Sequence, residues 1–210
     1  MSARSDVVRV AHSIHRRGLT HGRTGNLAVR EGENILVTPT GVCLSDVTAS
    51  DLSLIGTDGA HLDGPKPTKE AFLHAAMLRG RPEDDAVVHT HSVHSAALST
   101  LDLSEHEDPL PILTAYYAMR VPALRVLPYI APGDTAAADR VESAAATSGA
   151  LLLRNHGPVV AAGDLDAALD ALEELEHVAQ IFFLTRGMAR SALTPEAVAA
   201  LRPSTGRPHP

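Results

Sequence analysis

Apolar residues recur at helical spacing at the start of the chain and at strand spacing soon afterwards. Residues 7–14 place their apolar side chains on one side of a helix, which Gly18 would end. Residues 26–38 form two short apolar runs around a polar turn at 31–34, the pattern of a β-hairpin. A second hairpin is predicted at 54–62, with a glycine in its turn.

The remaining segments mix helices and strands. Helices are predicted at 68–80, capped by Thr68, at 93–101 and at 134–148, and a long helix begins after Asp164. Strands are predicted at 86–91, 151–153 and 159–161, and an acidic loop at 102–111. The acidic residues of the long helix, Glu173, Glu174 and Glu176, are assigned to its solvated side. Hairpins interspersed with helices predict sheet layers covered by helices.

Length and composition fit one globular domain. The chain has 210 residues, of which 44% are hydrophobic and 20% charged, so it is not expected to be disordered. We expect a single domain over 1–201 and a flexible tail at 202–210, where Pro, Gly and Ser are frequent, unless a neighbouring subunit captures that tail. The net charge of −7 and the scattered basic residues argue against a nucleic-acid partner.

The same sequence gives no indication of secretion or membrane insertion. Cys43 is the single cysteine and cannot form an internal disulfide. No apolar run approaches the length of a membrane span, and residues 1–18 mix charged residues into their apolar positions, unlike a signal peptide. We therefore expect a cytoplasmic protein with no membrane partner.

The chain is rich in histidine, and three of its 12 histidines have a spacing that predicts a metal site. His89 and His91 lie two residues apart on a predicted strand, so their side chains would share one face about 6–7 Å apart. The alternative, two polar residues on an exposed strand face, is weakened by the neighbouring valines at 87–88. His156 ends the apolar run at 151–153 and is either a third ligand or an ordinary turn residue. Three histidines with one open position are typical of catalytic zinc.

The other histidines carry less information. His94 either orients a ligand or is simply a packed residue at a helix start. The remaining eight have no informative spacing and are treated as ordinary: His12, His15, His21, His61, His74, His106, His177 and His209.

A carboxylate and a cation stand together where the 68–80 helix begins. Glu70 is either an ordinary acidic residue at a helix N-terminus or an acid/base beside the metal. Lys69 is unfavourable to the helix dipole, so it is either a cation used by a ligand or an ordinary exposed lysine. The loops at 22–26 and 38–41 have glycines and hydroxyls that either bind an anion or make common turns.

Five segments, taken together, resemble the class II aldolase/adducin family. They are GRTGNLAVR (22–30), LVTPTG (36–41), KPTKEAFLH (66–74), VVHTHSVHS (87–95) and LLLRNHGPVV (151–160). The resemblance implies an α/β fold, a three-layer α/β/α sandwich around a mostly antiparallel sheet. It also implies a homotetramer with active sites at the subunit interfaces.

The same resemblance assigns roles to individual residues. His89, His91 and His156 match the ligands of one Zn²⁺ per chain, for which Mn²⁺ or Fe²⁺ can substitute, and Glu70 matches the catalytic acid/base. The positions that match phosphate-binding residues are Asn26, Thr40, Gly41, Thr68 and Lys69. The sugar-phosphate aldolases usually have serine where this chain has Lys69. Tyr116 and Tyr117 match a tyrosine pair near the active site, and the sequence leaves open which ring faces it.

The segments 66–74, 113–121, 127–134 and 155–160 most resemble the 3-oxo-tetronate 4-phosphate decarboxylase branch. In such a reaction the substrate, a small phosphorylated sugar acid, would lose CO2 through a zinc-bound enediolate and yield dihydroxyacetone phosphate. A class II sugar-phosphate aldolase of the L-fuculose-1-phosphate type, acting on a ketose, and a ribulose-phosphate 4-epimerase remain alternatives. A non-catalytic adducin-like module is disfavoured because the three histidines and Glu70 are all retained.

Overall fold

The computed structural model describes residues 2–103, 108–121 and 123–201, so the predicted tail at 202–210 lies outside the described residues. Eight strands of the described chain form one sheet in the order β4-β3-β2-β1-β5-β8-β7-β6, and only β6 and β7 run parallel. The strands are β1 (Asn26–Glu31), β2 (Asn34–Val37), β3 (Ser53–Ile55), β4 (His61–Asp63), β5 (Ala86–His89), β6 (Leu124–Leu127), β7 (Ala150–Leu153) and β8 (Gly157–Ala162).

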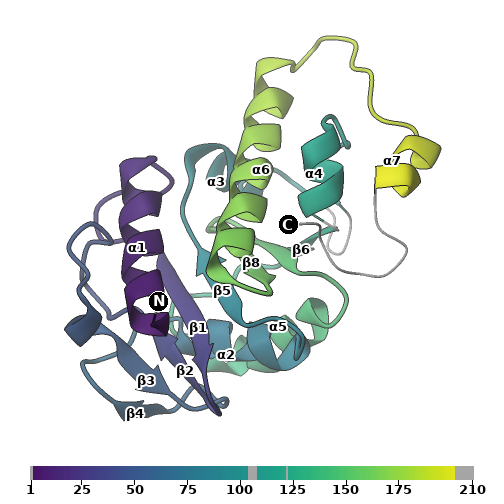
Figure 1. The fold of residues 1–210 in the computed structure, drawn as a ribbon. Coiled ribbons are helices and arrows are strands. Elements are labelled where there is room, and N and C mark those ends of the chain that lie inside the picture. Colours follow the sequence, from purple (N-terminus) through teal and green to yellow (C-terminus); the bar gives the residue numbers. More distant parts are fainter. Residues whose placement is uncertain (1, 104–107, 122, 202–210) are drawn as a thin grey trace.

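Helices cover both faces of this sheet (Figure 1). They are α1 (Ala3–Arg16), α2 (Ala71–Gly80), α3 (Val93–Ser99), α4 (Ala115–Arg120), α5 (Ala138–Ala145), α6 (Leu165–Leu184) and α7 (Pro195–Leu201), with short 3-10 turns at Ala49–Asp51 and Thr135–Ala137. The predicted three-layer α/β/α sandwich with a mostly antiparallel sheet is confirmed.

Alternation along the strands divides the core into two parts. Leu27 and Val88 pack in one cluster with α1, α3, α4 and α6. Ala28 and Val87, their neighbours in the chain, pack in the other cluster with α2 and α5. Successive strand side chains point to opposite faces, so each central strand contributes to both clusters.

The structure also differs from the sequence prediction in several elements. β6, α4 and α7 were not predicted. The helix expected to begin at Thr68 begins at Ala71, with Glu70 as its N-cap residue. The strand expected to reach His91 ends at His89, so His91 lies in the loop that follows. Among the described residues, no helix is both long and apolar enough to cross a membrane.

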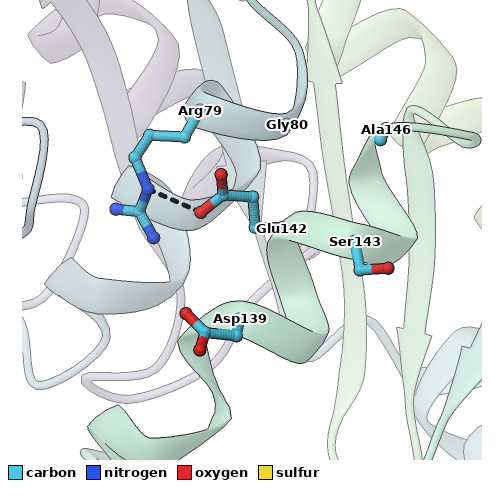
Figure 2. Close-up of a pocket in the computed structure, with 6 residues that line it drawn as sticks. All are labelled: Arg79, Gly80, Asp139, Glu142, Ser143 and Ala146. Atoms are coloured by element: carbon cyan, nitrogen blue, oxygen red, sulfur yellow. Dashed lines mark hydrogen bonds and ion pairs between the residues drawn. The ribbon is translucent and has the colours of Figure 1, made fainter.

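Helices α2 and α5 pack closely where α2 ends. A Cβ atom on Gly80 would lie 2.5 Å from the carbonyl oxygen of Glu142, so this contact requires glycine. Beside it is a surface hollow in which Arg79 Nε donates to Glu142 at 2.6 Å (Figure 2). The hollow lies at the opposite end of α2 from Glu70, about 15 Å of helix away at 1.5 Å per residue. It is therefore separate from the site described next.

Candidate metal centre

Four side chains from distant parts of the chain converge at one end of the central strands. The nitrogen and oxygen ligand atoms of Glu70, His89, His91 and His156 all lie within 4.8 Å of one another. Nε2 of His91 is 3.1 Å from Nε2 of both His89 and His156. The Glu70 carboxylate oxygens lie 3.1 Å from His156 Nε2 and 3.4 Å from His89 Nε2. The predicted metal ligands and the predicted acid/base therefore occupy one site.

Strand pairing places two of the site residues opposite each other. Asn26 at the start of β1 pairs with His89 at the end of β5. Ala28 and Val87 point toward α2, and residues two apart on a strand share a face, so Asn26 and His89 point the same way. Glu70 at the N-cap of α2 meets them there.

Close backbone contacts fix the loops that bring the other two histidines in. A Cβ atom on Gly157 would lie 2.5 Å from the carbonyl oxygen of Thr90, so only glycine lets the turn after His156 approach the loop that holds His91. Gly25 has a φ of +80°, and its Cβ atom would lie 3.2 Å from the carbonyl oxygen of His89. These two glycines allow the backbone to pack tightly around the site.

The imidazoles are held in the form that binds metals. His89 Nδ1 donates to the carbonyl oxygen of Pro158 at 2.7 Å, which leaves Nε2 unprotonated and directed at the other ligands. Burial lowers the pKa of His89. Burial, with the nearby His89 and His156, lowers the pKa of His91 to about 3. Neutral imidazoles are the species that coordinate a divalent cation.

Glu70 is ionised in this environment. Burial by itself would raise the pKa of Glu70, but the neighbouring His89, His156 and Asn26 side chains outweigh it and lower that pKa. Three imidazole nitrogens and one carboxylate are a donor set that zinc accepts. The residues present therefore fit the metal that the sequence predicts.

A hydrogen-bonded chain lies behind the carboxylate. Asn26 Nδ2 donates to Glu70 Oε2 at 2.7 Å, and Asn26 Oδ1 accepts from His74 Nε2 at 2.5 Å. His74 is fully buried, and its treatment as an ordinary histidine was wrong. The only sequence signal for its role is its position one helical turn after Glu70.

The predicted phosphate-binding segments lie side by side next to Glu70. Pro39 and Pro67 form an isolated bridge, and Thr68 N donates to the Thr38 carbonyl oxygen at 3.1 Å. The Thr68 hydroxyl accepts from the Glu70 backbone N–H at 3.3 Å. The structure thus brings 38–41, which holds Thr40 and Gly41, against the segment that ends in Lys69. Their binding roles stay predictions.

The two tyrosines lie outside the group of four ligand residues. Tyr117 is a residue of α4 and is fully buried in the core. Tyr116 is 59% exposed, with the Arg120 guanidinium 5.5 Å from its ring centroid. Tyr116 therefore is the ring that faces outward, and a catalytic role for either tyrosine stays a prediction.

Comparison with known proteins agrees with the fold and with this cluster. The family described as Class II Aldolase and Adducin N-terminal domain matches residues 5–183. This chain belongs to the class II aldolase and adducin family.

Several relatives within this family have names that describe lyases. A 3-oxo-tetronate 4-phosphate decarboxylase of Haemophilus influenzae is 42% identical over 189 residues, 90% of each chain. An L-fuculose phosphate aldolase of Escherichia coli is 32% identical and covers 81% of this chain and 77% of its own. The crystal structure of YgbL from Klebsiella pneumoniae, described as an aldolase, epimerase or decarboxylase, has a TM-score of 0.90 at 36% identity, covering 95% of this chain and 97% of its own. These relatives support an enzyme of the lyase class.

A further acidic residue of this class II aldolase fold was assigned wrongly. Glu176 does not lie on the solvated side of α6, because its side chain is only 14% exposed. Its carboxylate accepts from the backbone N–H groups of His94 and Ser95 at 2.9 and 2.8 Å, and from His94 Nδ1 at 2.8 Å. His94 is therefore a helix-start residue held by α6, three residues after His91. Nothing in the local pattern of α6 distinguishes Glu176 from its acidic neighbours.

Proposed function

We propose that this chain is a metal-dependent carbon–carbon lyase that decarboxylates a 3-oxo-tetronate 4-phosphate to dihydroxyacetone phosphate and CO2. The observation that carries the proposal is the convergence of three imidazoles and one carboxylate within 4.8 Å. Relatives named for this decarboxylase, at 38–42% identity over at least 90% of the chain, support the choice of reaction.

The three imidazoles would hold a zinc ion, one per chain, with Mn²⁺ or Fe²⁺ as substitutes. When bound, the ion supplies a Lewis acid that stabilises negative charge on the substrate oxygens. His89, His91 and His156 contribute by directing their Nε2 atoms toward a common point.

Glu70 would move one proton during the reaction. Because its pKa is lowered, Glu70 begins as a carboxylate and accepts the proton of the substrate 2-hydroxyl. The C1–C2 bond then breaks, CO2 leaves, and the electron pair stays on C2 as an enediolate. Glu70 returns its proton to C2, and the oxygen on C2 takes one proton from solvent. The product is dihydroxyacetone phosphate.

Residues near Glu70 would bind the charged ends of the substrate. Thr40, Gly41 and Thr68 lie on the two segments that pair beside Glu70, and they would offer the two threonine hydroxyls and the Gly41 backbone N–H to a phosphate. Lys69 is exposed next to Glu70 and would hold the carboxylate or the phosphate. The Asn26 amide is already bonded to Glu70 and His74, so its contribution to phosphate binding is secondary.

An aldolase acting on a ketose 1-phosphate would form the same enediolate after losing an aldehyde, whereas a ribulose-phosphate 4-epimerase would form an unphosphorylated enediolate and add the aldehyde back. The 32% identity to an L-fuculose phosphate aldolase makes the aldolase the second candidate. Lys69 favours the decarboxylase, because the substrate of that reaction has a carboxylate for a cation to bind, whereas the part of a ketose 1-phosphate that leaves as an aldehyde is uncharged.

Product analysis of the purified, zinc-loaded protein tests these alternatives. We expect 3-oxo-erythronate or 3-oxo-threonate 4-phosphate to yield CO2 and dihydroxyacetone phosphate in equal amounts. Cleavage of L-fuculose 1-phosphate alone would indicate the aldolase, and an isomerised pentulose phosphate without fragments would indicate the epimerase.

The variant Lys69→Ser tests the cation. We expect it to lower decarboxylation by about tenfold or more, the effect of losing one charge-assisted contact, while the zinc content stays unchanged. The measurement is kcat/KM for the acid beside metal analysis of the same sample. Unchanged turnover of both acids and ketose phosphates would contradict this role of Lys69.

We further propose that the chain acts as a homotetramer whose sites lie at subunit interfaces. Val93, two residues from His91, is 67% exposed, and Tyr116 and Tyr129 are 59% and 58% exposed. A neighbouring subunit would cover such apolar side chains. Light scattering of the purified protein measures the assembly directly.

A further inference from the structure

We propose that His74 is a positioning residue for the reaction. Its imidazole holds the Asn26 amide in the single orientation that directs an N–H bond at the Glu70 carboxylate. The inference rests on the proposed function only where Glu70 is taken as the group that moves the proton.

The hydrogen bonds fix which atoms carry protons. Asn26 Oδ1 has no proton to give, so the proton shared at 2.5 Å lies on Nε2 of His74. Among the described residues, His74 Nδ1 is buried without a hydrogen-bond partner. Burial lowers the pKa of His74 to about 3, so the ring is neutral at physiological pH and has a single N–H to donate.

The reverse orientation of the amide is unfavourable. Rotation of the Asn26 side chain by half a turn would place Oδ1 at the position 2.7 Å from Glu70 Oε2 that Nδ2 now occupies. Two acceptor oxygens would then face each other without a proton between them, and the amide nitrogen would face the N–H of His74. His74 and Glu70 therefore fix the orientation of Asn26 from its two sides, and His74 is the donor that holds Oδ1 away from Glu70.

Core packing alone does not explain a histidine at this position. The other α2 residues from Ala71 to Leu78 that surround His74 in the chain are apolar and buried. Burying an imidazole with one unpartnered nitrogen costs more free energy than burying a leucine of similar size. The polar ring is explained by its hydrogen bond to Asn26, whose amide in turn contacts the Glu70 carboxylate.

This arrangement predicts a defect in turnover with little effect on binding. The substitution His74→Leu removes the donor, so the Asn26 amide can rotate and Glu70 loses a fixed N–H partner. The histidine ligands are untouched, since His89 is held through its own bond to Pro158. We expect kcat to fall by about tenfold or more, as is usual for residues behind a metal site, with KM and zinc content unchanged.

Two variants control for destabilisation. His74→Gln keeps a side-chain N–H that can donate to Asn26, and it should regain most of the lost kcat. His12→Leu removes a partly buried histidine of α1 whose Nε2 bonds to the Val47 carbonyl oxygen at 2.9 Å, on the other face of the sheet. It should lower stability in a similar way and keep the wild-type kcat. Equal kcat for His74→Leu and His74→Gln, or wild-type kcat in both, would overturn the proposal.

Nitrogen-15 NMR of histidine-labelled, zinc-loaded protein tests the tautomer without any substrate. We expect an exchange-protected proton on Nε2 of His74 whose resonance shifts in Asn26→Ala. A proton on Nδ1, or a signal unaffected by Asn26→Ala, would refute the positioning role. If no acid is decarboxylated, the proposed function fails, while this measurement still decides whether His74 orients Asn26.

Discussion

At the scale of single residues, the site consists of ionisable side chains that are buried, and burial disfavours their charged forms. His74 is fully buried, and the Glu70 and His89 side chains are 8% and 0% exposed. Each is stable there because it is paired or neutral: Glu70 accepts from Asn26, and the imidazoles lose their protons. The pairing that prepares the ligands for a metal also makes the fold sensitive to acid.

Acid should destabilise the metal-free protein through His74. Its folded pKa of about 3 lies below the ordinary value of 6.5, so the unfolded chain gains a proton first as the pH falls. The free energy of unfolding is unaffected above pH 6.5 and should fall below it, by about 1.4 kcal/mol per pH unit for this group. Urea unfolding of the wild type and of His74→Gln measures the effect. The pH range runs from about 6.5 to 4.5, because Glu70, whose ordinary pKa is 4.5, contributes at lower pH as well. Parallel pH profiles for the two proteins would show that His74 is protonated in the fold.

At the scale of elements, α6 fixes the start of α3 and with it the loop that holds His91. Helix α3 is short, and its N-cap residue Ser92 makes no side-chain cap bond within the described chain. Glu176 from α6 provides the acceptor for two of the free N–H groups instead. A carboxylate at this end also complements the helix dipole.

Removal of that carboxylate should loosen the loop. We expect Glu176→Ala to lower the free energy of unfolding by about 1–3 kcal/mol, the cost of leaving buried donors unpaired. Hydrogen exchange should increase at His94 and Ser95 first. Glu174→Ala is the matched control, because Glu174 has no hydrogen-bond or ion-pair partner among the described residues. A similar loss in both variants would show that Glu176 is not a specific cap.

At the scale of the whole molecule, sequence patterns predicted the layers and the residues that gather at the candidate site but not the contacts between distant elements. The alternation at 26–38 and the apolar face of the last long helix specify their own neighbours, so those elements were predicted. Glu176 and His74 depend on partners 81 and 48 residues away, which no local pattern encodes. The short strand Leu124–Leu127 lacks an alternating pattern long enough to detect and is stabilised by pairing with β7.

Metal analysis of the purified protein tests the central claim most directly. We predict about one zinc per chain in the wild type, in line with a three-histidine site, and almost none in His156→Ala at unchanged circular dichroism. His94→Ala should keep its zinc, because His94 bonds to Glu176 and lies outside the cluster. A wild-type protein that is free of divalent metal and fully active, or a His156→Ala variant that keeps its zinc, would contradict the account.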